Sequence, residues 1–460
     1  ENLLCKELFS YDPFDITGPV SDDNHFYGRR AEALDIARQL QIGQIKATLG
    51  IRKIGKTSII NRIVDTCNKY YECMIVVIDC SKDEIWSLNS SELLYSISCS
   101  INKIRENNDK YTILLPTSSI KDIKESAKAL TDEIGLCNYP IILVFDEIDY
   151  ITPGSPTGKH WITEFNPFWR NLRGIYQECM RTKKPFSMLL SGVSSKWFRV
   201  ESINGIENSA LSLVPEEYLS PLPRGATIAM IKTLSRVAGL QFDETSAEQI
   251  AATCCDSPYW VRKACSYIHK RIDIQIRPMK PNIELIKNYL EDFVNSEGGI
   301  IAQIAIQHLF RVFPELKQFC KCCFLNKYSE VPKSYISILI KYGLIREGLK
   351  GFELSGMMIK EGLSLIFDEK NEKDSEEQMI TNNNFEKSSI EEWADELAIV
   401  NRRRNILEKK LRSIVLNFLR YDSLQDKSKT NPHDRIIKKV DERRRKQIER
   451  LGPDELIENF

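Results

Sequence analysis

The sequence lacks the features of secreted and membrane proteins. It has no run of about 18 uninterrupted apolar residues that could form a membrane-spanning helix. Its first residues, ENLL, lack the basic segment and the long apolar segment of a secretory signal peptide. The 13 cysteines are scattered and odd in number, so they cannot all form disulfides. These absences indicate a cytoplasmic protein in a reducing compartment.

Neither the net charge nor the spacing of histidines and cysteines indicates a particular partner or a metal site. The 64 basic and 64 acidic side chains cancel, so the net charge favours no class of partner. The five histidines are far apart, and the cysteine string at 320–323 lacks the paired C-x-x-C spacing of zinc sites. We therefore interpret those cysteines as buried thiols. With 460 residues, the chain is long enough for about two to four domains.

Apolar runs that alternate with helical patterns organise the first half of the chain. The run at 73–80 is continuously apolar, as in strands that are buried on both faces. Such alternation predicts an α/β fold with a parallel sheet and helices on both of its faces. The runs are QIKATLG at 44–50, CMIVVIDC at 73–80, YPIILVFDEID at 139–149 and FSMLLSG at 186–192.

The stretch ATLGIRKIGKTSII, residues 47–60, contains the pattern G-x-x-x-x-G-K-[ST]. A strand-like run precedes it and a helical pattern follows, which is the context in which such a loop binds phosphate. Backbone N–H groups attract the phosphates, Lys56 reaches the β- and γ-phosphates, and the Thr57 hydroxyl binds Mg²⁺. The alternative is a surface turn. The expected nucleotide contacts are Gly50, Ile54, Gly55, Lys56, Thr57 and Ser58.

Two adjacent carboxylates follow the apolar run that begins at residue 139. In open α/β sheets, ligands bind outside the carboxyl ends of the strands. We therefore expect Asp146 to hold Mg²⁺ and Glu147 to orient the attacking water, so that ATP and Mg²⁺ are the expected cofactors. The alternative is an ordinary acidic turn. We expect Asp149, further along the same turn, to be solvated.

Hydroxyl and basic residues near the same edge of the sheet have two interpretations each. Ser191 or Ser194 would lie near the γ-phosphate and sense its presence, or would be simple loop residues. Arg52 and Lys53, inside the phosphate loop, would face solvent, or would contact a partner or the γ-phosphate.

These pieces, in their order, resemble a known group of proteins. FYGRRAEA, LGIRKIGKTSII, IILVFDEID, LLSGVSS and EEYLSPLPRGAT are similar to the AAA-like P-loop ATPases of the STAND class, and to the related archaeal ATPases and origin-recognition initiators. The resemblance covers roughly residues 26–370. It implies that Tyr27, Gly28 and Arg29 help to hold the nucleotide base.

The resemblance also implies a helical lid and a winged helix. The usual Gly-x-Pro turn of the lid is here CCDSPYWVR, with Asp256 in place of the glycine, and Pro258 and Arg262 are the expected nucleotide contacts. In the STAND class the winged helix packs on the nucleotide domain and helps to keep it inactive, whereas in the initiators it binds DNA. Arg199 is either a finger for a neighbouring subunit or a structural arginine.

Changes in pattern divide the chain into six expected segments. After residue 220 the strand-like runs give way to helical ones, and residues 288–367 have the helices and short ribbon of a winged helix. The segments are an irregular N-terminal segment (1–25), a P-loop ATPase core (26–220), a helical lid (221–286), a winged-helix domain (287–370), an acidic linker (371–390) and a charged helical region (391–460).

The last segment is basic after an acidic linker. Residues 401–450 hold 17 basic and 7 acidic side chains. Three interpretations stay open: a solvated helical pair, a nucleic-acid contact surface, or the start of an effector or sensor domain. NILEKKLRSIVLNFLRY is faintly similar to the opening helix of HEPN-type domains. The Arg-to-His pattern of their ribonucleases is absent, since His433 is the only nearby histidine.

Together these patterns predict a slowly hydrolysing ATPase that acts as a switch, with Lys56, Asp146, Glu147 and Ser191 at the γ-phosphate. The resemblance implies self-association on ATP binding, which activates the C-terminal region or a partner in prokaryotic signalling or antiviral defence. A nucleic acid or a protein is the partner expected at the basic C-terminal region, and a membrane is not. The alternative is an initiator-type ATPase that binds DNA through its winged helix.

Overall fold

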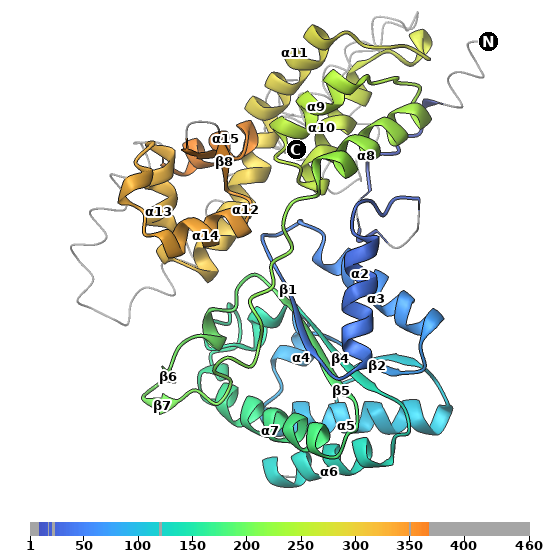
Figure 1. Cartoon of the computed structure of the whole chain (residues 1–460), viewed down its shortest axis with the longest axis vertical. Coiled ribbons are helices and arrows are strands. Elements are labelled where there is room, and N and C mark those ends of the chain that lie inside the picture. Colours follow the sequence, from blue (N-terminus) through green and yellow to red (C-terminus); the bar gives the residue numbers. More distant parts are fainter. Residues whose placement is uncertain (1–8, 17, 21–23, 119–121, 349–350, 368–460) are drawn as a thin grey trace, which may run out of the picture. The chain divides into compact units, whose positions relative to one another are not determined.

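The computed structural model describes residues 9–16, 18–20, 24–118, 122–348 and 351–367 (Figure 1). The chain forms two units, Glu1–Asn371 and Glu372–Phe460, and every described residue belongs to the first. The predictions for the acidic linker and for the charged region, with its HEPN-like stretch, therefore lie outside the described residues. Among the described helices, none combines the length and the apolar character that a membrane span needs.

A five-stranded parallel sheet forms the centre of the first half, which confirms the predicted α/β class. Its order is β1 (Ile45–Leu49), β5 (Phe186–Gly192), β4 (Ile141–Asp146), β2 (Met74–Asp79) and β3 (Tyr111–Ile113). In the register of the strands, Asp79 lies opposite Asp146 and Leu49 opposite Gly192. The carboxyl ends of these strands therefore meet at one edge.

Helices cover both faces of this sheet (Figure 1). On one face lie α2 (Arg30–Gln41) and α3 (Lys56–Tyr70), and on the other lie α5 (Ser90–Asn107), α6 (Ile123–Leu136) and α7 (Trp161–Arg181). Alternate residues of β4 serve the two cores, because successive side chains of a strand point to opposite faces. Ile142 and Val144 join the first cluster, and Leu143 and Phe145 join the second.

Short elements complete the sheet region at its edges. The segment 217–219 runs alongside β1, where the Leu49 N–H donates to the Glu217 carbonyl at 2.9 Å and the Leu219 N–H donates to the Leu49 carbonyl at 2.7 Å. α4 (Asp83–Trp86) follows β2, the 3₁₀ turn η1 (Ile148–Ile151) follows β4, and the short strands β6 (Ser202–Ile203) and β7 (Ile206–Glu207) form a hairpin after β5.

Helices and one hairpin make up the rest of the described chain. The predicted lid contains α8 (Arg224–Val237), α9 (Glu244–Thr253) and α10 (Pro258–Arg271). α11 (Ile283–Phe293) crosses position 286, where we place the boundary to the winged helix. The order that follows is the one expected of a winged helix: α12 (Gly299–Val312), α13 (Glu315–Phe324), α14 (Lys333–Lys341), the antiparallel pair β8 (Ile345–Gly348) and β9 (Gly351–Leu354), and α15 (Met357–Phe367).

Truncation of Phe168 to alanine is expected to destabilise the sheet region. Phe168 is fully buried on α7, with ring centroids 6.2 Å from Phe145 and 5.2 Å from Trp169. Removing such a ring leaves a cavity, so the free energy of unfolding should fall by about 3–5 kcal/mol, measured by urea denaturation. Ile162→Ala on the exposed face of α7 is the control and should cost under about 1 kcal/mol. Equal effects of the two changes would contradict this packing.

Candidate nucleotide-binding site

The phosphate-loop pattern lies where its mechanism needs it, between the end of β1 and the start of α3. Gly55, the residue before the first turn of α3, has φ +106°. A side chain there would be strained, and its Cβ would come within 2.9 Å of Arg29 Nη1. Glycine is therefore required for the loop to turn into the helix whose N-terminal N–H groups favour an anion.

Lys56 is buried at the base of this loop. Its Nζ donates to the Gly50 carbonyl at 3.1 Å and lies 3.5 Å from the Ile51 carbonyl. Loop carbonyls therefore position the ammonium group at the end of the helix, and only 5% of the residue is exposed. A cation held there is suited to contact with a phosphate chain.

Thr57 and Asp146, the two expected magnesium ligands, are brought together. The Thr57 hydroxyl donates to Asp146 Oδ2 at 3.0 Å, across 89 positions of sequence. A hydroxyl beside a carboxylate is the donor set by which P-loop enzymes hold Mg²⁺, so these residues fit the ion. Asp79 ends the neighbouring strand opposite Asp146 and adds a second carboxylate at this edge.

The pKa of Asp146 is raised, first because the carboxyl is buried and second because Glu147 is adjacent. Ser191, Thr57 and Lys56 act in the opposite direction. Ser191 is fully buried at the end of β5, and its hydroxyl makes no hydrogen bond of ordinary geometry within the described residues. Such a hydroxyl beside Asp146 is consistent with the polar role at the strand end that we predict for it.

Ser194, the alternative to Ser191, contacts groups other than Asp146. Its Oγ accepts a hydrogen bond from the Lys196 N–H at 3.1 Å, in the turn after β5. Ser191 lowers the pKa of Asp146, whereas Ser194 lowers the pKa values of Asp149 and Tyr342.

Asp149 is buried, which corrects our expectation that it is solvated. Only 7% of the residue is exposed, and its Oδ2 accepts a hydrogen bond from the Val193 N–H at 2.6 Å. Glu147 adopts φ +51°, and the 3₁₀ turn that follows directs Asp149 toward the end of β5, where the Val193 N–H lies. Burial raises the pKa of Asp149 to about 6.

A cavity of about 460 Å³ opens beside these groups. Arg52, Lys53, Lys56 and Arg262 make it cationic, and Glu147 is its acidic member. Arg52 and Lys53 therefore line the cavity while staying exposed, and a polyanion is the ligand that this charge favours. The remaining lining residues are Ile16, Gly18, Pro19, Val20, Gly55, Thr57, Ser58, Pro258 and Tyr259.

The stretch Tyr27–Arg29 lies behind the loop and does not line this cavity. Arg29 is 5% exposed, and its guanidinium donates to the Ile54 carbonyl at 2.7 Å and to the Ser220 carbonyl. Gly28 packs close to Ala226. Arg29 therefore supports the loop from behind, and Ile54, a loop residue that we predict as a contact, is buried.

The cavity wall formed by Ile16 and Gly18–Val20 is absent from our sequence predictions. It belongs to a stretch that we describe only as irregular, because DITGPV has no helical or strand periodicity. Its proline and glycine next to apolar residues are the one local signal of an ordered turn. The Val20 N–H donates to Ser58 Oγ at 3.0 Å, so Ser58 binds this wall.

The lid supplies Pro258 and Arg262 to the cavity, as expected, and adds Tyr259. Pro258 begins α10, the first helical position being one where its missing N–H is harmless. Asp256 adopts φ +53°, a backbone conformation that glycine favours, and pairs with Arg224 at 2.9 Å. Asp256 can therefore replace the glycine of the Gly-x-Pro turn, because it adopts the same left-handed backbone conformation.

Arg199 is held within its own chain. Its Nη2 donates to the Val214 carbonyl at 3.2 Å, and its Nε lies 3.2 Å from a carboxylate oxygen of Glu216. These contacts favour the structural interpretation of Arg199. The cysteines Cys320 and Cys323 are buried, and no group of three metal-binding side chains occurs within the described part of the chain.

No family model matches this chain, and no curated protein matches it. Among solved structures, it is similar to a Walker-type ATPase of Pyrococcus abyssi, with 16% identity, a TM-score of 0.47, and coverage of 76% of this chain and 99% of that one. It is also similar to the Aeropyrum pernix ORC1 protein in complex with DNA, with 13% identity, a TM-score of 0.36, and coverage of 77% of this chain and 95% of that one. For the Thermotoga maritima RuvB branch migration motor the identity is 14%, the TM-score is 0.35, and the coverage is 73% of this chain and 95% of that one.

Replacement of Asp149 by asparagine should change the pH dependence of stability. Between about pH 4 and pH 6 the folded state keeps a proton on Asp149 that the unfolded state has released. The free energy of unfolding from this group therefore falls as pH rises through that range, by about 2–3 kcal/mol. An asparagine side chain at this position would be neutral throughout and keep an oxygen for the Val193 N–H.

Urea denaturation at pH 4.5, 5.5, 6.5 and 7.5 measures this difference. Asp149→Asn should lose less stability than the wild-type chain as pH rises from 4.5 to 6.5. Asp132→Asn, on α6, is the control and should follow the wild-type profile. Parallel profiles for Asp149→Asn and the wild-type chain would contradict the buried carboxyl.

Proposed function

We propose that this protein is an ATP-binding and ATP-hydrolysing switch of the P-loop class. The observation that carries this proposal is the Thr57–Asp146 hydrogen bond at the mouth of a cationic cavity that Glu147 also lines. The cavity volume, about 460 Å³, is within the range of small-ligand sites. A nucleotide with its phosphates at the start of α3 would meet the charge that it requires.

Each residue at the phosphate end has a definable task. Bound Mg²⁺ would neutralise charge on the phosphates, and Thr57 and Asp146 would hold it. Lys56 stabilises negative charge that develops on the β- and γ-phosphates. Glu147, at the exit of β4 and on the cavity wall, orients water for attack and accepts its proton. Ser191 adds a hydroxyl near Asp146 that can respond to the γ-phosphate.

A switch needs a connection between this site and another domain. The Asp149 carboxylate accepts from the Val193 N–H, and the Val193 carbonyl accepts from the Tyr342 hydroxyl at 2.8 Å. Tyr342 is buried at the end of α14, in the predicted winged helix. Two hydrogen bonds therefore join the turn that bears Glu147 to that domain.

Further contacts surround the Tyr342 hydrogen bond. The Tyr342 and Tyr218 rings are 5.1 Å apart edge to face, and Lys341 lies 3.7 Å from Glu216. We propose that the nucleotide state changes this packing, that the released form self-associates, and that the C-terminal region or a partner then responds. Signalling or antiviral defence is the role that the sequence resemblance implies.

The same contacts weigh against the alternative, an initiator-type ATPase that grips DNA with its winged helix. α14 would be the helix to enter a groove, and its only basic residues are Lys333 and Lys341. Lys341 is engaged by Glu216, and the end of the helix is buried at Tyr342. Such a helix offers little charge to phosphates. Salt-dependent DNA binding by the purified chain would revive this alternative.

Replacement of Glu147 by glutamine tests the hydrolase. The amide cannot accept a proton from water, so the rate of ATP hydrolysis should fall by about 100-fold or more, while ATP is still bound. Phosphate release at saturating ATP measures the rate, and fluorescence of a labelled nucleotide measures binding. Lys56→Ala should lose binding as well. An unchanged rate in Glu147→Gln would show that hydrolysis does not use this residue.

Light scattering on a sizing column then tests the switch. The wild-type chain with ADP is expected to keep its smallest mass, whereas Glu147→Gln with ATP and Mg²⁺ should assemble. The same mass in both conditions would refute nucleotide-driven assembly and leave ATP hydrolysis untouched.

Tyr342→Phe is expected to favour the released form. The change removes one buried hydrogen bond and leaves the Val193 carbonyl unpaired, a cost of about 1–2 kcal/mol. The ATP concentration that gives half-maximal assembly should fall by about fivefold to tenfold, measured by light scattering. Tyr335→Phe is the matched control, because Tyr335 lies on the same helix, α14, and packs its ring on Phe319. Identical curves for both variants would contradict this role of Tyr342.

A further inference from the structure

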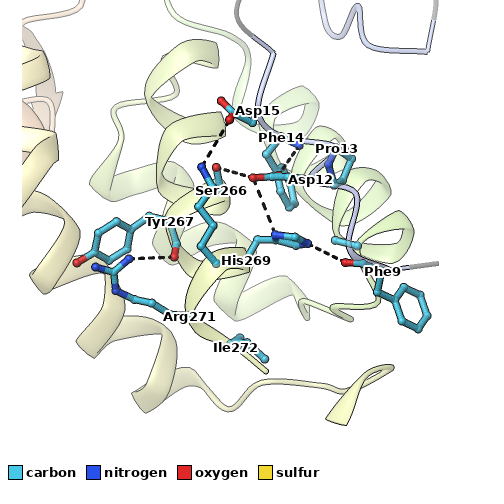
Figure 2. A network of polar contacts seen from close by, with 12 residues as sticks. Phe9, Asp12, Pro13, Phe14, Asp15, Ser266, Tyr267, His269, Arg271 and Ile272 are labelled. Atoms are coloured by element: carbon cyan, nitrogen blue, oxygen red, sulfur yellow. Dashed lines mark hydrogen bonds and ion pairs between the residues drawn. The ribbon is translucent and has the colours of Figure 1, made fainter. Parts of the chain in front are cut away.

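The N-terminal stretch is bound along one face of the lid helix α10. We call residues 9–16 and 18–20 the strap. Ser266 Oγ donates to Asp12 Oδ2 at 2.6 Å, and His269 Nε2 donates to the Phe9 carbonyl at 3.3 Å (Figure 2). Ser266 and His269 lie three positions apart, so they share one face of the helix.

Asp15 adds an ionic contact to the same face. Its carboxylate lies 2.8 Å from Lys263 Nζ and 3.5 Å from Lys270 Nζ. These lysines hold the pKa of Asp15 below its ordinary value, the hydrogen bond from Lys263 being the largest cause. At neutral pH the strap therefore carries a carboxylate between two cations of the lid.

Apolar contacts order the beginning of the strap. Phe14 is 2% exposed and belongs to the main core cluster. The Phe9 ring lies against Gly239, where any Cβ would come within 2.7 Å of it. Gly239 also has φ +70°, a backbone conformation that other residues rarely adopt. Both the backbone and the contact with Phe9 therefore disfavour a larger residue at this position. The strap is thus packed as well as hydrogen-bonded on the lid.

The other end of the strap forms a wall of the nucleotide cavity. Ile16 and the stretch Gly18–Val20 line it, and the Val20 N–H is bonded to Ser58 in the first turn of α3. One short segment therefore contacts the lid, the cavity and the helix of the phosphate loop.

A second connection runs through the side chains beneath the strap. Lys263, which binds Asp15, lies over the Tyr259 ring at 5.8 Å from its centroid. Lys53 of the phosphate loop lies 5.2 Å from the centroid of the same ring. Tyr259 lines the cavity, so Asp15 is two side chains from the loop. Cation–aromatic contacts of this kind give the ring a preferred position.

We propose that the strap sets how long a nucleotide stays bound, with Asp12 and Asp15 as positioning residues that act through Ser266 and Lys263. This inference rests on the nucleotide site proposed above. Ile16 and Gly18–Val20 form one wall of the cavity, so their position determines how closely a bound nucleotide is enclosed. Weakening the attachment of the strap to α10 therefore speeds release, while the phosphate-end chemistry is unchanged because Lys56, Thr57, Asp146 and Glu147 keep their contacts.

Stopped-flow fluorescence tests this with the full chain, Mg²⁺ and N-methylanthraniloyl-ADP, chased with excess ADP. Asp15→Asn should raise the dissociation rate by about threefold, and Asp15→Asn with Ser266→Ala by about tenfold. Single-turnover hydrolysis at saturating ATP should stay within about twofold of wild type. Asp15→Glu keeps the charge and should restore most of the wild-type dissociation rate.

Glu244→Gln is the matched control. It removes an ion pair of the lid, Lys232–Glu244 at 2.6 Å, that does not involve the strap, and should leave the dissociation rate unchanged. A wild-type rate in the double variant, with its fold intact by circular dichroism, would overturn the role of the strap. Loss of hydrolysis together with faster release would also overturn it. Failure of the wild-type chain to bind the labelled nucleotide would instead overturn the proposed function, and the strap with it.

Discussion

The parallel register of β1, β5 and β4 is the constraint on which the candidate site depends. It ends the three strands at one edge, with Leu49 opposite Gly192, and so brings the phosphate loop, Asp146 and Ser191 within reach of one another. The hydrogen bond from Thr57 to Asp146 then joins the start of α3 to the end of β4. Without that register, Thr57 and Asp146 would belong to separate loops.

Buried arginines hold the backbone around this edge. Arg29 donates to carbonyls at Ile54 and Ser220, and Arg262 donates to carbonyls of the N-terminal stretch at Pro13 and His25. Burial lowers the pKa of Arg29 to about 10, so it remains charged at neutral pH. Guanidinium groups suit this role, because one side chain satisfies two carbonyls that helices and strands leave unpaired.

Two sets of contacts leave the site in opposite directions. One runs through Asp149 and Val193 to Tyr342 in the winged helix, and the other runs through Tyr259 and Lys263 to the strap. The first consists of short buried hydrogen bonds, which are costly to leave unmade. The second consists of partly exposed ionic and cation–aromatic contacts, which are individually weak. We therefore expect the first to separate discrete states and the second to adjust a rate.

The sequence by itself determined four strands of the sheet (β1, β2, β4 and β5), the phosphate loop and the acidic pair, because each is a local pattern of neighbouring residues. Lys56, Thr57, Asp146 and Glu147 could be assigned tasks from spacing alone. Only the tertiary structure decided which residues enclose the cavity. Its wall at Ile16 and Gly18–Val20 belongs to an N-terminal stretch that is bonded to Ser58 through Val20 and to Ser266 through Asp12, about 40 and 250 positions away.

The burial of Asp149 was equally beyond the sequence. It depends on the left-handed backbone of Glu147 and on an N–H group of Val193, 44 positions away. The short strand β3 is missing from the runs that we predict, and its parallel pairing with β2 is visible only in the folded chain. In each case the deciding group is distant in the chain, and local periodicity carries no information about it.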